Sequence, residues 1–207
     1  MKYPKLREIR EALRSFFSPA YTGKFPYAPG KAFPNFRGKP TPDENECITC
    51  GACAEVCPAG AIEIKENTGL KPPTREVIWH YDLCIFCGQC ESLCSTQKGV
   101  KLSQEYDLST FDRNTLFSKV EKELLVCEDC GAIIGPKPQL LWLIKKLGPL
   151  ASGNFNLINT AQKELGIALE TVTEITSPPY DRGNLYKMLC PKCRHTVLVF
   201  NQTGKQS

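Results

Sequence analysis

Residues 47–57 read CITCGACAEVC and residues 84–94 read CIFCGQCESLC, and these two stretches decide the fold. Each has the spacing C-x2-C-x2-C-x3-C, and the second copy begins 37 residues after the first (84 − 47 = 37). A short turn of small residues lets the first three thiols of a run converge on one point, whereas the fourth lies one helical turn further on. Gly51 and Gly88 stand at matching places and allow a close approach of the backbone.

This spacing is that of bacterial proteins with two [4Fe-4S] clusters, in which the fourth cysteine of each run ligates the other cluster. A disulfide framework and a pair of zinc sites are the alternative interpretations. Disulfide scaffolds occur mostly in short secreted chains, and zinc would not call for the doubled spacing. We therefore expect two ligand sets: Cys47, Cys50, Cys53 and Cys94 for one cluster, and Cys84, Cys87, Cys90 and Cys57 for the other.

The 207-residue chain contains 12 cysteines, 16 prolines and 15 glycines, which predicts short elements and much irregular structure. Strand-prone stretches follow or precede the runs at 61–64, 77–81 and 100–102. The expected fold class is α+β, with a duplicated bacterial-ferredoxin-like domain over residues 41–107. An extended N-terminal arm (residues 1–40) would precede it, and a zinc-ribbon-like module with a helical insertion (residues 108–207) would follow.

The N-terminal arm carries most of the positive charge. The chain has 26 Lys and Arg against 22 Asp and Glu; residues 1–40 hold nine against two, and the remainder holds 17 against 20. Residues 4–17 form one apolar stripe at helical spacing, with basic residues on the other faces. Such a helix docks on an anionic membrane or a partner, or packs on its own domain. The proline- and aromatic-rich residues 25–40 favour extended chain along a partner surface.

The C-terminal half holds a second cysteine set, Cys127, Cys130, Cys190 and Cys193. Two C-x2-C turns between strand-prone segments, the last at 196–200, predict a structural site for one zinc ion. A single iron or a third cluster is the alternative occupant. A helix is expected over 138–147. The C-terminal region lacks a basic stripe with interleaved aromatics, and the charge of residues 41–207 is slightly negative. We therefore expect no nucleic-acid binding.

Three single residues near the cysteines need an interpretation. Ser95 follows Cys94, where Pro58 stands at the matching place after Cys57. A hydroxyl there could donate a hydrogen bond to sulfur and raise the potential of the cluster held by Cys94, or could simply fill the position. His80 and His195 lie close to cysteines in sequence, but we expect neither to be a ligand because each site already has four cysteines.

The chain resembles the two-cluster ferredoxin-type subunit of membrane-bound [NiFe] hydrogenases, including formate hydrogenlyase, and is similar to the corresponding subunit of respiratory complex I. Three stretches carry the resemblance: residues 36–40 (FRGKP), 84–90 (CIFCGQC) and 101–107 (KLSQEYD). The second cysteine set resembles the C-terminal extension of the formate-hydrogenlyase type. Residues 140–189 match nothing recognisable.

The resemblance implies a non-catalytic subunit of an oxidoreductase complex. It would pass single electrons through two [4Fe-4S] clusters, from a formate dehydrogenase or a ferredoxin to the cluster chain of a membrane-associated hydrogenase. The alternative is an electron-transfer subunit of a complex I-like quinone oxidoreductase or another multi-subunit oxidoreductase. The expected partners are other subunits of such a complex, on the cytoplasmic side of the membrane. No apolar run approaches the length of a membrane span.

Overall fold

The computed structural model describes residues 5–20, 22–28, 30–167 and 187–203, and the chain divides into two units, Met1–Phe36 and Arg37–Ser207. In the first unit, helix α1 spans Leu6–Phe17. The Glu8 carboxylate accepts a hydrogen bond from the Lys5 backbone N–H (3.1 Å), which closes the first turn. The apolar stripe is exposed, to 87% at Leu6 and 83% at Phe16. The predicted amphipathic helix is therefore confirmed.

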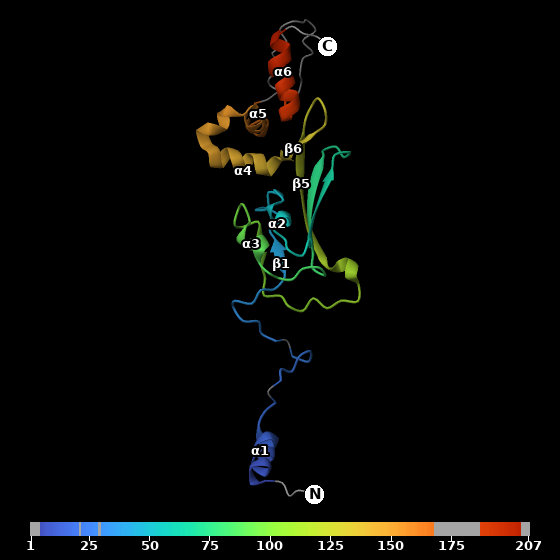
Figure 1. Ribbon diagram of the computed structural model, residues 1–207, viewed down its shortest axis with the longest axis vertical. Coiled ribbons are helices and arrows are strands. Elements are labelled where there is room, and N and C mark those ends of the chain that lie inside the picture. The colour runs from blue at the N-terminus through green and yellow to red at the C-terminus, as the bar shows by residue number, and fades with distance from the viewer. Residues whose placement is uncertain (1–4, 21, 29, 168–186, 204–207) are drawn as a thin grey trace. The chain divides into compact units, whose positions relative to one another are not determined.

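The second unit is built on a four-stranded antiparallel sheet with the order β2-β3-β5-β6 (Figure 1). The strands span Ile62–Asn67 (β2), Thr74–His80 (β3), Phe117–Val126 (β5) and Ile133–Pro136 (β6). The central strand β3 pairs with a strand on each side and buries three consecutive residues, Val77, Ile78 and Trp79. Val77 and Trp79 point to the same face of the sheet and belong to the main core. The expected strands at 61–64 and 77–81 are confirmed as β2 and β3, with bounds that differ by at most three residues.

The sheet continues beyond the cysteine runs into the C-terminal half. Strand β5 pairs with β3 over seven residues, from Thr74 opposite Glu123 to His80 opposite Phe117. It then pairs with β6, with a register shift between Leu125 and Val126. Residues on either side of position 107 thus share one sheet, and the far end of β5 leads directly into Cys127.

A second, two-stranded sheet joins the segments that flank the cysteine runs. Strand β1 (Pro40–Pro42) pairs with β4 (Val100–Leu102), so the residues before the first run lie beside those after the second. A side chain at Gly38 would collide with the carbonyl oxygens of Ser103 and Glu105, which explains glycine there. The short helices α2 (Ala52–Glu55) and α3 (Gln89–Ser92) each contain the third cysteine of a run, Cys53 and Cys90.

The main core lies between the sheet and the cysteine loops. Trp79, Val100 and Val120 are each at most 3% exposed, and Cys47, Cys53 and Cys94 pack against this cluster. The cysteine loops therefore form part of the core itself, as expected for a small domain that has little apolar surface to bury. The result is a mixed α/β unit.

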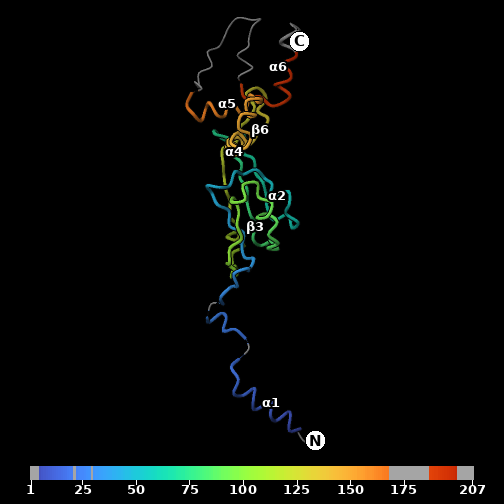
Figure 2. The backbone as a smooth tube through the Cα atoms, turned by 90° about the vertical axis from the view of Figure 1, so that its left-hand side faces the viewer, coloured from blue at the N-terminus to red at the C-terminus, as the bar shows by residue number. Residues whose placement is uncertain are grey.

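The C-terminal half is mainly helical. A short 3-10 turn, η1 (Arg113–Thr115), precedes β5; α4 (Lys137–Leu147), η2 (Gly148–Gly153) and α5 (Phe155–Glu164) follow β6. Leu140, Ala151 and Leu157 form a small separate core against Leu125 and the α4 side chains. In the tube view of Figure 2, α4 and α5 lie next to the β6 end of the sheet. The expected helix at 138–147 is confirmed as α4.

One expectation for this half is wrong. Residues 196–200, expected to be a strand, belong to helix α6 (Pro191–Thr203). Pro191 suits the first position of a helix, and the Arg194 backbone N–H donates to the Cys190 carbonyl at 2.8 Å. Val197 packs against the buried cluster of Cys127, Leu189 and Cys190, so tertiary packing overrides the strand propensity of this apolar run. The second C-x2-C turn thus opens a helix, unlike that of a zinc ribbon made of strands.

Candidate metal centres

The structure sorts the eight cysteines of the two runs into two sets of four. Cys47, Cys50, Cys53 and Cys94 line one cavity, which we call the first cavity. Cys57, Cys84, Cys87 and Cys90 line another, which we call the second cavity. Each cavity thus takes three cysteines from one run and the last cysteine of the other. The membership of both sets is the same as that expected from the sequence. Trp79 lines both cavities, so the two share a wall.

The two runs have the same backbone conformation. Thr49 and Phe86, between the first two cysteines, have left-handed φ values of 47° and 54°. Gly51 and Gly88 follow in the same region, at 83° and 81°, and each begins its four-residue helix. The left-handed turns reverse the chain tightly, so that three sulfurs face one cavity. Threonine and phenylalanine are unusual at positive φ, and such strain persists where a site requires it.

Two arginines hold these turns from outside. The Arg75 guanidinium donates to the Thr49 carbonyl oxygen (Nη1 to O, 3.4 Å) and pairs with Glu66. Arg37 donates to the Cys87 carbonyl oxygen (Nη1 to O, 3.2 Å). Each turn therefore has one peptide carbonyl fixed by a guanidinium from a segment distant in sequence.

The surroundings of the thiols fit soft metal ligation. Burial raises the pKa of Cys53 to about 12 and that of Cys90 to about 11. Thiols in such apolar surroundings are inert as free acids, and iron bound as a cluster takes them as thiolates. The donor set is four sulfurs in each cavity, which is the set that cubane clusters use. The residues present therefore fit two [4Fe-4S] groups.

Cys94 has a different environment. Burial acts to raise the pKa of its thiol, but hydrogen bonds from the Thr96 hydroxyl and from the backbone N–H groups of Thr96, Gly99 and Val100 outweigh it, so that the pKa is lowered. The Thr96 Oγ1 atom lies 3.4 Å from the Cys94 sulfur. Ser95 Oγ lies 3.4 Å from the Cys50 sulfur, in the same cavity. Sulfur contacts in the second cavity come from backbone, as in Ala61 N–H to Cys57 (3.3 Å).

Sequence reasoning had singled out Ser95 alone and missed Thr49 and Thr96. Thr49 lines the first cavity and is 1% exposed, and its hydroxyl has no hydrogen-bond partner among the described residues. The signal that would have found both was present in the repeat, because the offset of 37 residues aligns Thr49 with Phe86 and Thr96 with Ala59. His80 lines the second cavity, but its Nε2 atom lies 3.2 Å from the Glu63 carboxylate.

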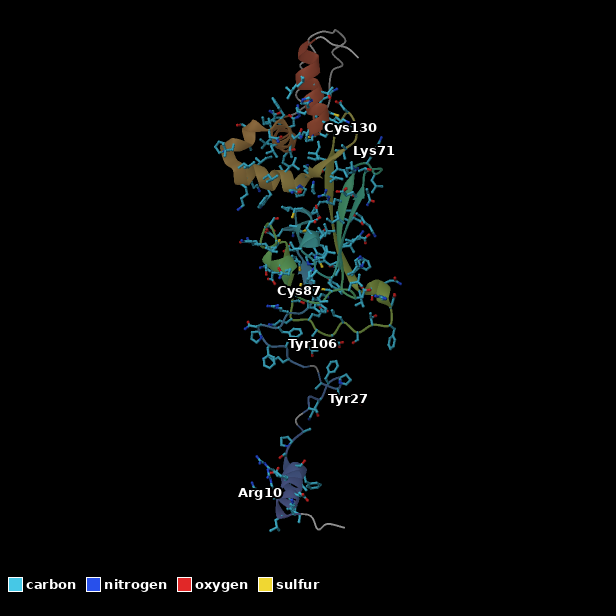
Figure 3. The ribbon with its side chains drawn as sticks, in the orientation of Figure 1. Arg10, Tyr27, Lys71, Cys87, Tyr106 and Cys130 are labelled. Atoms are coloured by element: carbon cyan, nitrogen blue, oxygen red, sulfur yellow. The ribbon has the colours of Figure 1, made fainter. Side chains whose placement is uncertain are left out.

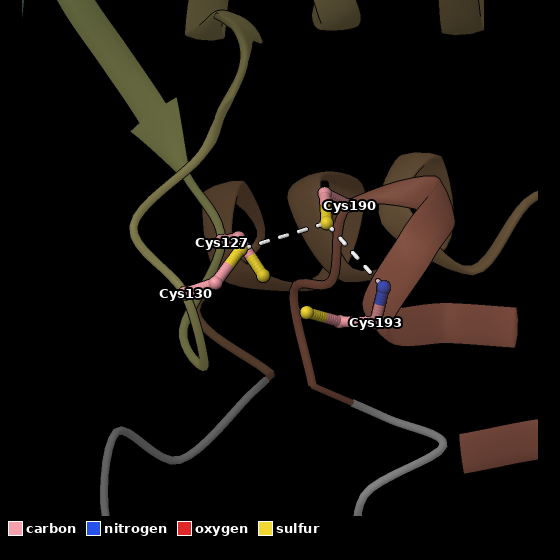
Figure 4. Close-up of side chains that lie close together, drawn as sticks. All are labelled: Cys127, Cys130, Cys190 and Cys193. Atoms are coloured by element: carbon pink, nitrogen blue, oxygen red, sulfur yellow. Dashed lines mark hydrogen bonds between the residues drawn. The ribbon is translucent and has the colours of Figure 1, made fainter. Parts of the chain in front are cut away.

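The remaining four cysteines also come together. The sulfurs of Cys127, Cys130, Cys190 and Cys193 all lie within 4.8 Å of one another. The first two stand on the loop between β5 and β6, and the last two stand at the start of α6 (Figure 4). Figure 3 labels Cys130 of this set and Cys87 of the second run. Four converging thiols are the ligand set of a structural zinc site.

The helical insertion braces this site. Asn156, on α5, donates from its amide to the Leu189 carbonyl (2.8 Å) and accepts from the Leu189 N–H (3.2 Å). Its amide oxygen also accepts from Arg194 (3.1 Å). The Glu128 N–H donates to the Met188 carbonyl (2.9 Å), which joins the two cysteine loops directly. His195 lies on α6 outside the four-sulfur set.

The thiols of this four-cysteine site have different pKa values. Burial opposes ionisation of Cys127, but N–H groups of Cys130, Cys190 and Asp129 outweigh it and lower its pKa to about 6. Hydrogen bonds with Cys130 and Cys190 and burial raise the pKa of Cys193 to about 12. Ionisation is thus favoured at Cys127 and disfavoured at Cys193. A dication would displace the proton of Cys193.

Residues 46–98 match the family model described as a 4Fe-4S dicluster domain. This segment is a two-cluster iron–sulfur domain. Its cavities are those described above, and the match covers both runs.

Several curated relatives match about half of the chain. Formate hydrogenlyase subunit 6 of Escherichia coli is 36% identical over 111 residues, which are 53% of this chain and 59% of that protein. NAD(P)H-quinone oxidoreductase subunit I of Gloeobacter violaceus is 30% identical over 98 residues, 46% of each chain. The chain therefore spans about half the length of these two relatives. NADH-quinone oxidoreductase subunit I 2 of Geobacter metallireducens is 28% identical over 60% of this chain and 98% of its own.

These similarities confirm the predicted resemblance to the ferredoxin-like subunits of formate hydrogenlyase and of complex I. A chain of the membrane-bound sulfane sulfur reductase, an archaeal respiratory membrane complex, is 29% identical over 56% of this chain and 61% of its own, with a TM-score of 0.40. None of the helices in the described part of the chain has the length and apolar character that a membrane span requires.

Proposed function

We propose that this chain is an electron-relay subunit that carries two [4Fe-4S] clusters. The observation that carries the proposal is the sorting of eight cysteines from two runs into two cavities of four, with Trp79 as a shared wall. Each cluster supplies a one-electron acceptor held by thiolates. The protein fixes the two groups close together, surrounds them with apolar side chains and excludes water, which are the ways a fold tunes a cluster potential.

The relay joins a donor module to an acceptor in a multi-subunit complex. We assign the donor to a formate dehydrogenase or a ferredoxin, and the acceptor to the cluster chain of a membrane-associated [NiFe] hydrogenase on the cytoplasmic side. Support comes from the similarity to formate hydrogenlyase subunit 6. A second candidate, a subunit of a complex I-like quinone oxidoreductase, is favoured by the similarity to the quinone oxidoreductase subunits.

The proposal includes two domains after the N-terminal arm. Residues 41–107 form the duplicated cluster domain, and its two halves share the left-handed turns at Thr49 and Phe86. Residues 108–207 hold one structural zinc ion at Cys127, Cys130, Cys190 and Cys193, supported by the convergence of the four sulfurs. The four thiolates would link the β5–β6 loop to α6 through the ion and would fill its coordination sphere. The site would therefore be structural and take no part in electron transfer.

The arm, residues 1–40, docks the subunit on its complex. The exposed stripe of α1 and the exposed aromatics Phe25, Tyr27 and Phe33 are its contact surface. An apolar face of this size flanked by arginines fits a membrane-associated assembly with an acidic rim. We expect no nucleic acid among the partners.

Anaerobic purification of the full chain from its native host tests the proposal. Quantified metals should give about eight irons, eight sulfides and one zinc per chain, and hydrogenase or quinone-oxidoreductase subunits should copurify. The identity of the copurifying subunits decides between the two candidate complexes. About twelve irons without zinc would reassign the C-terminal site to a third cluster. A preparation with no iron would refute the relay.

A further inference from the structure

The two cavities have the same sulfur ligands but differ in their hydroxyl groups. Three hydroxyls belong to the first cavity: Thr49 lines it, and Ser95 and Thr96 each lie 3.4 Å from one of its sulfurs. The residues at the matching repeat positions are Phe86, Pro58 and Ala59, which have no hydroxyl. Within the described part of the chain, no Ser, Thr or Tyr lines the second cavity. The internal repeat thus provides its own comparison.

The geometry directs these protons toward the sulfurs. A thiolate bound to iron has no proton to donate, so each hydroxyl near it is the donor. Thr96 Oγ1 accepts hydrogen bonds from the N–H groups of Gly99 (3.0 Å) and Lys98 (3.5 Å), which leaves its own proton free for Cys94.

Thr49 is placed to contribute most. Its hydroxyl is buried and has no partner among the described residues, and a buried hydroxyl left unpaired is costly. A cluster in the first cavity would supply the missing acceptor. The left-handed φ of 47° holds this β-branched side chain in place, and Arg75 fixes its carbonyl. Ser95 is exposed, so water competes with its hydrogen bond and its effect should be the smallest.

Resting on the proposed function, we propose that the cluster in the first cavity has the higher reduction potential because the hydroxyls of Thr49, Thr96 and Ser95 surround it. Hydrogen bonds to cluster sulfur stabilise the reduced form, which carries one more negative charge. An electron that enters from the donor module therefore comes to rest in the first cavity. The step transfers one electron, and no bond forms or breaks.

Two other polar groups line the cavities, the Trp79 indole and the His80 imidazole. Trp79 has a buried indole N–H with no partner among the described residues, but this residue lines both cavities and does not distinguish them. His80 lines the second cavity, and its Nε2 atom lies 3.2 Å from the Glu63 carboxylate. The His80→Gln variant measures its contribution separately.

The test is a redox titration of the anaerobically purified full chain, followed by electron paramagnetic resonance. The wild type should show two components with different midpoint potentials. Thr49→Val and Thr96→Val should each lower the higher one, whereas Thr49→Ser and Thr96→Ser, which keep a hydroxyl, should not. We expect the double valine variant to lower the reduced-to-oxidised ratio at the wild-type midpoint roughly tenfold, about 59 mV for a one-electron couple.

The second cavity provides the reverse experiment. Ala59→Thr places a hydroxyl at the position that matches Thr96, and it should raise the lower component alone. Equal shifts of both components, or no shift in the valine variants and in Ala59→Thr, would overturn the inference. Iron and sulfide measured on every variant separate this from the proposed function: about eight irons with unchanged potentials refute only the role of the hydroxyls.

Discussion

The hydroxyl oxygen of Ser95 lies 3.4 Å from the sulfur of Cys50, a residue of the other cysteine run. The contact spans 45 positions of sequence and places the end of the second run over the cavity of the first. The same interleaving assigns Cys94 to the first cavity and Cys57 to the second. Each run therefore depends on the other to complete its ligand set.

This interleaving predicts which single substitutions remove the same cluster. Cys94→Ala should abolish the spectral component that is lost in Cys47→Ala, and Cys57→Ala the component lost in Cys84→Ala. Each variant should retain about half of the iron, if the remaining cluster assembles. Electron paramagnetic resonance with iron analysis checks both pairs. If Cys94→Ala instead matches Cys84→Ala, the crossed assignment is wrong.

The four-cysteine site predicts a pH-dependent release of protons on zinc binding. The pKa of Cys127 is lowered from 9.0 to about 6, so its thiolate contributes stability to the metal-free fold at pH above 9 and loses this contribution as the pH falls through about 6. Addition of zinc to chelator-treated protein at pH 7.5 should therefore release fewer than four protons, with Cys193 among the donors. At pH 5 the number should rise toward four and the affinity should fall. Four protons at both pH values would contradict the assignment for Cys127.

The exposed stripe of α1 predicts a loss of assembly without a loss of clusters. Leu13→Glu with Phe16→Glu places charge on the apolar face, which should prevent copurification with partner subunits and leave the iron content unchanged. Phe111→Glu is the control, because Phe111 is a fully exposed apolar residue that lies in the second unit. Affinity purification from the native host with subunit identification measures the result. Unimpaired copurification of the double variant would exclude α1 as a docking element.

The hydroxyl of Tyr81 links the two sheets, and we expect its removal to lower the stability of the fold. Its hydroxyl donates to the Pro40 carbonyl (3.0 Å) and lies 2.6 Å from Ser118 Oγ. Tyr81→Phe leaves the buried Pro40 carbonyl without this donor and should lower the free energy of unfolding by about 1–3 kcal/mol. Chemical denaturation under anaerobic conditions checks the value. Tyr27→Phe, at a residue 97% exposed, should change it by less than about 0.5 kcal/mol.

Much of the fold was predictable because its signals are local. The amphipathic stripe of residues 4–17 predicted α1, and the apolar runs around Val77 and Val100 predicted β3 and β4. The strand expected at 196–200 was wrong because a short apolar run has no preference strong enough to resist its tertiary setting. Pro191 starts a helix there, and Val197 completes a buried cluster with Cys127.

The sequence by itself determined the chemistry of this protein. The spacing of the cysteines specifies four-sulfur ligand sets, since metal ligation limits both the residue types and the separations that can work. Tertiary structure alone decided what surrounds those sulfurs. The hydroxyls of Thr49 and Thr96, the guanidinium of Arg75 and the brace of Asn156 act through packing and hydrogen bonds between segments distant in sequence. The repeat marks Thr49 and Thr96 as positions where its two halves differ, but only the folded chain shows which atoms these side chains approach.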